Sequence, residues 1–423
     1  MKFIMTPVKG MNDFMPEDMR LREHVLGLIK ETYATYGFEQ IETPAMEHIE
    51  NLTGKQGGEN EKLIFKVMKR GRELEKGMET GELADSGLRY DLTVPLARYY
   101  SNNRNNLPTP LKALQIGNVW RADKPQKGRF RQFTQCDIDI IGDGSIMAEI
   151  ELIAATSKML TRIFSEVGIK EFTVHINDRR ILKAMAASAG FTEDQFDDVF
   201  ITLDKMDKIG LDGVKESLLN HGYAQEAVEK YISYFSQITP DLKCGAFCGS
   251  TCGEFLDQKV PGNMDTIMNS VSCMIDPSVS LVFDPTLVRG MSYYTGTIFE
   301  ISIDGYNFSI AGGGRYDEMI GRFSNQPAPA CGFSIGFERI VTILKDLKWS
   351  EGEGGKKRTA FLVDEKADPS RLLEVFKKAT ALREQGMIVT VQPLKKNAKF
   401  QIETLEKNGY EDIKKVYNDT ELN

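Results

Sequence analysis

The sequence lacks the long apolar run that a membrane-spanning helix needs, and it has few cysteines and histidines, 6 and 4 in 423 residues. A spanning helix takes about 20 consecutive apolar residues, and no run approaching that length is present. The opening residues, MKFIMTPVKGM, do not include the apolar region of a signal peptide. We therefore expect a cytoplasmic protein that has no membrane partner.

The cysteines are too scattered to resemble the disulfide framework of a small secreted protein. Three of them, Cys244, Cys248 and Cys252, repeat every four residues in CGAFCGSTCGEF and would line one face of a helix. Zinc sites usually pair their ligands two to four residues apart, and no histidine lies nearby. We expect no metal from this motif and interpret it as small residues at a helix-packing surface.

The charge balance is acidic overall and slightly basic at one end. The net charge is −8, which argues against indiscriminate binding of nucleic acid. Residues 356–423 carry 14 Lys and Arg against 11 Asp and Glu, a net charge of +3 that leaves −11 for the rest. With 41% hydrophobic and 27% charged residues, the composition is that of a globular protein of two or three domains.

Residues 119–142, VWRADKPQKGRFRQFTQCDIDIIG, predict two strands joined by a basic loop. The period of two in the second strand places one set of side chains on a common face, namely Arg129, Arg131, Phe133, Gln135, Asp137 and Asp139. Phe130, Cys136, Ile138 and Ile140 would point the other way. Guanidinium groups, an aromatic ring, an amide and carboxylates in this order suit a phosphate chain, a flat base and an ammonium group. The alternative is an exposed hairpin with a solvated outer face.

The remaining pattern alternates helices and strands. We expect helices over residues 16–36 and 146–167, strands over 63–68 and 172–176, and a loop or hairpin tip over 71–87. Residues 178–274 are helical in pattern, and strands return from Leu281 onward. After a linker at 345–358, the tail predicts strand 359–363, helix 370–385, strand 387–392, helix 399–407 and strand 413–417.

Four motifs resemble those of the histidyl-tRNA synthetases, a family of class II aminoacyl-tRNA synthetases, and they occur along the chain in the order found in that family. RADKPQKGRFRQFTQCDIDIIG is similar to motif 2, and GFSIGFERI at 332–340 is similar to motif 3. LVRGMSYYTGTIFE at 287–300 resembles the histidine-binding signature, and SIAGGGRYDE at 309–318 resembles the glycine-rich signature. Helix, strand and Pro44 near the start resemble motif 1, which builds the dimer interface in that family. The resemblance covers residues 7–347.

The resemblance implies an α+β fold, with a class II antiparallel sheet flanked by helices. The catalytic domain would comprise residues 1–177 and 275–347, and residues 178–274 would form a helical insertion over the acceptor end of tRNA. Residues 356–423 would form a small α/β domain similar to an anticodon-binding domain. That domain usually continues for another strand and helix, so we expect a shortened form here. Lys395, Lys396 and Lys399 cluster within it.

The resemblance also implies the substrates histidine, ATP with Mg²⁺, and tRNA(His), and a homodimer. Arg121 would bind the α-phosphate and Arg289 would act on its far side as the catalytic cation, both also lying beside histidine. The nucleotide would contact Arg121, Asp123, Arg131, Phe133 and Arg339, with Arg339 on the γ-phosphate. Histidine would contact Asp91, Thr93, Gln135, Asp139, Tyr293 and Tyr294. The backbone of Gly312, Gly313 and Gly314 would approach a ligand closely.

Several alternatives stay open at this point. Asp91 and Thr93 could cap the helix that begins near Val94, a role compatible with ligand binding, and the tyrosines could be packing residues. The family usually has Gly-Leu-Asp-Tyr-Tyr where this chain has Gly-Met-Ser-Tyr-Tyr, so Ser292 replaces a carboxylate. A synthetase-like regulatory subunit of ATP phosphoribosyltransferase, which binds histidine without charging tRNA, is the competing function. A nucleotidyl transferase for another small acid is a third.

Overall fold

A computed structural model describes residues 3–53, 59–125, 129–239, 241–289, 293–350 and 357–421. The chain forms two compact units, residues 1–14 with 22–348 and residues 15–21 with 349–423, and each is described by itself. No helix in the described ranges is long and apolar enough to cross a membrane.

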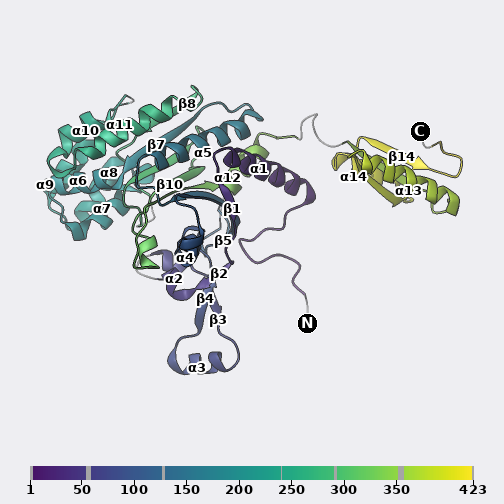
Figure 1. Ribbon diagram of the computed structural model, residues 1–423, viewed down its shortest axis with the longest axis horizontal. Helices are drawn as coiled ribbons and strands as arrows, with labels where there is room; N and C mark the ends of the chain where they lie inside the picture. Colours follow the sequence, from purple (N-terminus) through teal and green to yellow (C-terminus); the bar gives the residue numbers. More distant parts are fainter. Residues whose placement is uncertain are drawn as a thin grey trace. The chain divides into compact units, whose positions relative to one another are not determined.

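A mixed sheet organises the first unit (Figure 1). Within the described residues it has eight strands in the order β1-β5-β6-β11-β10-β9-β7-β8. Neighbouring strands run antiparallel except at β1–β5 and β7–β8, which are parallel. The predicted antiparallel sheet is therefore confirmed, with one parallel pair toward each edge. The strands are β1 (Glu39–Ile41), β5 (Leu111–Trp120), β6 (Gln132–Ile141), β7 (Phe172–Asp178), β8 (Val279–Phe283), β9 (Thr297–Ser302), β10 (Ala311–Arg315) and β11 (Ala330–Gly336).

The central hairpin forms where its sequence predicts it. β5 and β6 pair antiparallel from Trp120 opposite Gln132 to Leu111 opposite Ile141. Cys136, Ile138 and Ile140 on β6 are buried, and α5 (Met147–Ser165) and α12 (Phe337–Asp346) pack against this strand. Burial of this apolar face leaves the alternate, polar side chains of β6 on the other face.

The segment before β5 contains the clearest local difference from expectation. In its described residues this segment contains three α-helices besides the one at the hairpin tip, namely α1 (Pro16–Thr35), α2 (Ile49–Thr53) and α4 (Thr93–Asn103). It also contains a small sheet in the order β2 (Met46–His48), β4 (Ala84–Leu88) and β3 (Lys66–Met68). The tip of the β3–β4 hairpin is not a plain loop, because α3 (Arg72–Thr80) forms there (Figure 1). Glu73 and Glu75 lie in its first turn, where negative charge complements the helix dipole, and Gly81 ends it with a φ of 82°. The expected strand at 63–68 is reduced to β3, since Glu59–Leu63 forms a 3-10 helix.

Helices fill the segment between β7 and β8, as the pattern of residues 178–274 predicts. They gather beside these two strands in Figure 1 and comprise α6 (Arg179–Ala189), α7 (Phe196–Leu203), α8 (Met206–Asn220), α9 (Gln225–Phe235), α10 (Cys244–Thr251) and α11 (Lys259–Ser272). The first begins at Asp178, whose side chain accepts a hydrogen bond from the backbone N–H of Arg180. Cys244, Cys248 and Cys252 are buried in and just after α10, which agrees with a packing role.

The second unit is a small α/β layer structure. A parallel sheet, β13 (Ile388–Pro393), β12 (Arg358–Val363) and β14 (Asp412–Val416), lies between α13 (Pro369–Glu384) and α14 (Ala398–Lys407). Phe361 and Val363 pack with Val375 of α13, whereas Ala360 and Leu362 pack with Leu405 of α14. The alternation predicted for the tail is confirmed to within two residues at every boundary.

Candidate active site

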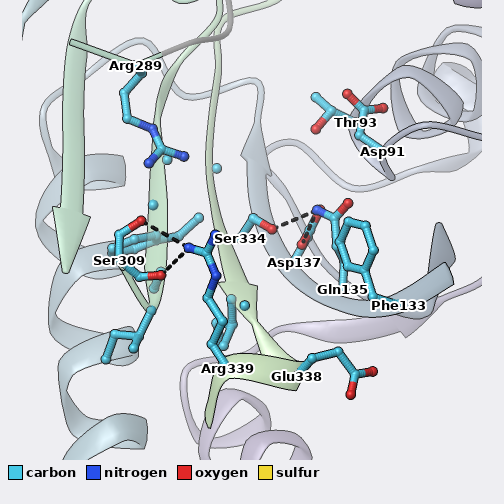
Figure 2. A pocket seen from close by; sticks show the side chains of 18 of the residues that line it. Asp91, Thr93, Phe133, Gln135, Asp137, Arg289, Ser309, Ser334, Glu338 and Arg339 are labelled. Atoms are coloured by element: carbon cyan, nitrogen blue, oxygen red, sulfur yellow. Dashed lines mark hydrogen bonds between the residues drawn. The ribbon is translucent and has the colours of Figure 1, made fainter. Parts of the chain in front are cut away.

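A cleft with a cavity volume of about 310 Å³ lies over the polar face of β6, β10 and β11. This volume is at the lower end of the roughly 300–1,000 Å³ range of small-molecule sites. Figure 2 shows side chains from distant parts of the chain converging there. The structure brings most of the predicted site residues to its lining, namely Asp91, Thr93, Arg121, Asp123, Phe133, Gln135, Asp139, Arg289, Tyr293, Tyr294, Gly312, Gly313 and Arg339.

Three carboxyl groups form one end of the cleft. Asp137 and Asp139 come from alternate positions of β6, and Asp91 comes from the turn before α4. All three are buried, and burial is the largest cause that raises the pKa of each above its usual value. Asp139 Oδ1 accepts a 2.6 Å hydrogen bond from the Tyr316 hydroxyl, whereas Oδ2 has no hydrogen-bond partner among the described residues. The three carboxyl groups therefore lie near one another in the cleft, and one of their oxygens lacks a partner among the described residues.

Asp91 serves two purposes at once. Its Oδ1 accepts a hydrogen bond of 3.1 Å from the backbone N–H of Val94, which caps the start of α4. The same side chain lines the cleft beside Thr93. The capping role and a place in the pocket are therefore compatible, as the sequence allowed.

Arg121 lies directly after β5 and makes three contacts with two aromatic residues, Tyr90 and Phe133. Its Nε donates to the Tyr90 carbonyl at 3.1 Å, and its guanidinium carbon lies 4.2 Å from the Tyr90 ring centroid. The Phe133 ring centroid is 5.1 Å away on the cleft side. Cation–π contacts and one carbonyl fix the guanidinium without neutralising it, so its charge is available to an anion.

Arg289 is a second cation, held over the backbone of β10. It forms an ion pair with Glu300 of β9 and is partly buried, and its Nε finds no partner in the part of the chain that the structure describes. A Cβ atom at Gly312 would lie 2.2 Å from Arg289 Nη1 and 2.4 Å from Cζ. Only glycine at position 312 leaves room for this guanidinium.

Arg339, from the first turn of α12, is the third cation of the cleft. Its Nη1 donates to the Ser309 carbonyl and, at 3.3 Å, to the Ser309 hydroxyl, as Figure 2 shows. Burial lowers its pKa below the usual value, and no carboxylate forms an ion pair with it among the described residues. A partly desolvated guanidinium with only neutral partners is a binding point for an anion.

Three tyrosines close the carboxylate end. The ring centroids of Tyr293 and Tyr294 are 4.8 Å apart, and the rings of Tyr293 and Tyr316 meet edge to face at 6.0 Å. Tyr316 in turn donates to Asp139. The tyrosines therefore pack together and also line the cleft, so the packing role is confirmed, and contact with histidine stays a prediction.

Comparison with known proteins decides the family. The model of the histidyl-tRNA synthetases matches residues 10–340 of this chain. The chain belongs to the histidyl-tRNA synthetase family. A histidine–tRNA ligase of Leifsonia xyli is 45% identical over 353 residues, 80% of each chain. A probable histidine–tRNA ligase of Tropheryma whipplei is 40% identical over 424 residues, 96% of this chain and 94% of that one.

Solved structures agree with this membership. A histidyl-tRNA synthetase of Nostoc superposes with a TM-score of 0.77 at 28% identity, covering 96% of this chain and 90% of that one. A Bacillus halodurans protein described as an ATP phosphoribosyltransferase regulatory subunit/histidyl-tRNA synthetase has a TM-score of 0.78 at 23% identity, covering 98% and 99%. At that identity the second likeness concerns the fold alone.

Two residues selected through the histidyl-tRNA synthetase motifs lie outside the lining of the cleft. Arg131 donates through Nε to the Asp123 carbonyl at 3.1 Å, so it supports the segment that carries Asp123. Gly314 has a φ of 159°, and a Cβ there would lie 2.5 Å from the Thr297 carbonyl oxygen and 3.0 Å from the Tyr294 ring. The glycines admit neighbouring protein groups: Arg289 over Gly312, and the backbone of Gly332 at 2.0 Å from a Cβ at Gly313. Ser292, which stands where the family usually has Asp, lies outside the described residues.

Other site residues carry no signal that sequence reasoning used. Glu300 is one polar residue in a strand, and only the fold shows that it pairs with Arg289. Glu338 lines the cleft and pairs with Arg22 at 2.6 Å across 316 residues of sequence. Asp137 was placed on the correct face but received no role. Asp137 lies on β6 between Gln135 and Asp139, two residues that the resemblance assigns to the site. A carboxylate at that position is the signal that could have identified it.

Proposed function

We propose that this chain is a histidine–tRNA ligase, which activates histidine with ATP to histidyl-adenylate and transfers it to tRNA(His). The observation that carries the proposal is the division of charge within one cleft. Three buried carboxyl groups that act on one another line the cleft, and so do the guanidinium groups of Arg121, Arg289 and Arg339, which also act on one another. An amino acid presents an ammonium group to the carboxyl groups and its carboxylate to the guanidinium groups, where the phosphates of ATP also bind.

At the amino-acid end, Asp91, Thr93, Asp139 and Gln135 would receive the ammonium group. Asp139 Oδ2, which has no hydrogen-bond partner within the described ranges, supports this, because a buried acceptor is costly unless a ligand donates to it. Tyr293 and Tyr294 would enclose the imidazole, which is planar and hydrogen-bonds at its edge.

At the nucleotide end, adenine would stack on Phe133, whose other neighbour is the Arg121 guanidinium. Arg121 would bind the α-phosphate, and Arg339 would bind the γ-phosphate through the guanidinium edge that Ser309 leaves open. Asp123 would orient the nucleotide directly, and Arg131 would do so by holding the Asp123 backbone.

The reaction joins two anions, so cations must stabilise the added charge. A carboxylate oxygen of histidine attacks the α-phosphorus, the bond to the bridging oxygen breaks, and pyrophosphate leaves. Charge develops on the non-bridging oxygens of the α-phosphate during this step. Arg121 and Arg289 would contact these oxygens from opposite sides, which is electrostatic stabilisation by preorganised donors. In the second step a hydroxyl of the terminal ribose of tRNA attacks the activated carbonyl, and AMP leaves.

ATP would enter as its Mg²⁺ complex. The described residues contain no group of three or more His, Cys, Asp or Glu that could hold a metal ion. The phosphate oxygens would therefore supply the main ligands of the ion, so Mg²⁺ belongs to the substrate.

The wider organisation is also a proposal. We propose a cytoplasmic homodimer in which residues 1–177 and 275–347 form the catalytic domain. Residues 178–274 would contact the acceptor end of tRNA, and residues 356–423 would contact its anticodon region. The net charge of +3 in that last segment supports contact with RNA phosphates.

Histidine-dependent exchange of labelled pyrophosphate into ATP tests the first step, and charging of tRNA(His) tests the second. We expect both activities, with no exchange for other amino acids. The retained Arg121, Arg289 and Arg339 favour a ligase over a regulatory subunit, which has no need of them. Histidine binding without exchange would contradict the ligase function and support the regulatory one.

A further inference from the structure

The Gln135 side chain lies between two groups of opposite hydrogen-bonding character. Its amide nitrogen donates to Asp137 at 3.2 and 3.3 Å and to the Ser334 hydroxyl at 2.8 Å, as the dashed lines in Figure 2 show. Its carbonyl oxygen accepts from Arg121 at 3.4 Å. A carboxylate can only accept and a guanidinium can only donate, so these two neighbours determine which way the amide points.

The strand register explains why Asp137 can play this part. Asp137 and Gln135 lie two residues apart on the same face of β6, and Ser334 of β11 is paired directly opposite Asp137. The Asp137 side chain is 3% exposed, so no bulk water competes for its oxygens. We propose that Asp137 is a positioning residue for histidine: as a carboxylate it fixes the Gln135 amide with its carbonyl oxygen beside Arg121, where a remaining lone pair of that oxygen can accept from the substrate's ammonium group.

This orientation of the Gln135 amide depends on the charge of Asp137. A protonated carboxyl group carries a donor, and it could hydrogen-bond the amide oxygen and release the amide to turn. Burial and the nearby charge of Asp91 raise the pKa of Asp137 to about 7, while Ser334, Gln135 and Arg121 oppose the increase. The other groups whose charge acts on or responds to Asp137 are Asp139, Arg89, Tyr294, Tyr33 and Cys136.

Histidine binding and the protonation of Asp137 should oppose each other. An arriving ammonium group favours the carboxylate form of Asp137, so binding lowers its pKa and releases a proton near neutral pH. Histidine should therefore bind more weakly as the pH falls through about 7. The imidazole of free histidine titrates in the same range, so the wild type has to be compared with a variant at each pH.

The inference rests on the proposed function, and Asp137→Asn tests it in the full-length protein. We expect KM for histidine in pyrophosphate exchange to rise about tenfold at pH 8, the effect of losing one oriented hydrogen bond, with kcat changed less than about threefold. The ratio of the variant's KM to the wild-type KM should fall toward 1 below pH 6, where the wild-type carboxyl is also protonated. A ratio near 1 at pH 8, or one independent of pH, would overturn the proposal.

Two further variants separate orientation from general damage. The double exchange Gln135→Glu with Asp137→Asn keeps the same number of side-chain atoms and the same charge. The amide nitrogen of the introduced asparagine can donate to the introduced glutamate, which still presents an oxygen toward the substrate, so KM should return to within about threefold of wild type. Ser334→Ala removes a bond to the same amide nitrogen but keeps the carboxylate. Because the Ser334 hydroxyl also lowers the pKa of Asp137, the pH dependence of this variant should keep the wild-type form but lie at higher pH. A double exchange no better than Asp137→Asn alone would contradict the positioning role.

Failure of the proposed function would look different. If wild-type protein binds histidine without exchange, calorimetric Kd values replace KM in the same comparison, and the role of Asp137 is tested without the ligase activity. Absence of histidine binding by the wild type would overturn both proposals.

Discussion

Substituting Gly312 by alanine should disable Arg289 without removing it. The added Cβ would lie 2.2, 2.4 and 2.5 Å from Nη1, Cζ and Nη2 of Arg289. Carbon and nitrogen atoms in contact need roughly 3.5 Å, so the guanidinium must move by about 1 Å or more. A displacement of that size at a reacting centre costs on the order of a hundredfold in rate.

We therefore expect the exchange rate of Gly312→Ala to fall about a hundredfold, which corresponds to about 2.7 kcal/mol of transition-state stabilisation. Arg289→Ala should lose at least as much. Because both changes act through one guanidinium, the double variant should be little slower than Arg289→Ala alone. Steady-state exchange kinetics at saturating histidine and ATP measure all three.

Gly262→Ala is the matched control. Gly262 lies in α11 with no heavy atom within 4 Å of an added Cβ, so its exchange rate should equal that of the wild type. Thermal melting would show whether Gly312→Ala keeps its fold. A well-folded Gly312→Ala protein that exchanges at the wild-type rate would refute the assignment of Arg289 as the catalytic cation.

Three other expectations can be tested with the same material. Tyr294→Phe and Gln135→Ala should each raise KM for histidine at least fivefold, because a buried polar partner is lost, and unchanged values would show that the pocket is placed wrongly. Deleting residues 356–423 should spare exchange but raise the tRNA concentration needed for charging and flatten its salt dependence; equal charging across a salt series would disprove this. Burial opposes the charge of His175, but the hydrogen bond that its Nδ1 donates to the Asp284 carboxylate and the charges of nearby carboxylates outweigh burial and raise the pKa of His175. The pair therefore stabilises the fold below about pH 6.5 and loses that effect as the pH rises. Asp284→Asn should thus lower Tm more at pH 6 than at pH 9, with a difference in the free energy of unfolding of about 1 kcal/mol at most.

The elements that could be predicted from the sequence are those whose signal is local. The alternation in β6 and the turn residues before it determine the central hairpin, and the tail alternates strand and helix with clear apolar patterns. α3 was missed because its glycines and charges are typical of a loop. Its acidic first turn and terminal Gly81 are helix signals that a hairpin tip was not expected to contain.

The site residues that could not be predicted depend on contacts between distant segments. Arg22 and Glu338 are ordinary charged residues in two helices until the fold buries them together. Gly312 indicates close approach, but only the structure shows that the approaching group is Arg289. A single sequence contains the side chains of such pairs but not the distance between them.

The course of the chain after the helical insertion has a mechanical consequence. The chain leaves α11, crosses the sheet once as β8, and reaches Arg289 six residues after Phe283. β8 is an edge strand that pairs only with β7 among the described strands. Backbone hydrogen bonds to a single neighbouring strand therefore hold the segment that connects these helices to Arg289.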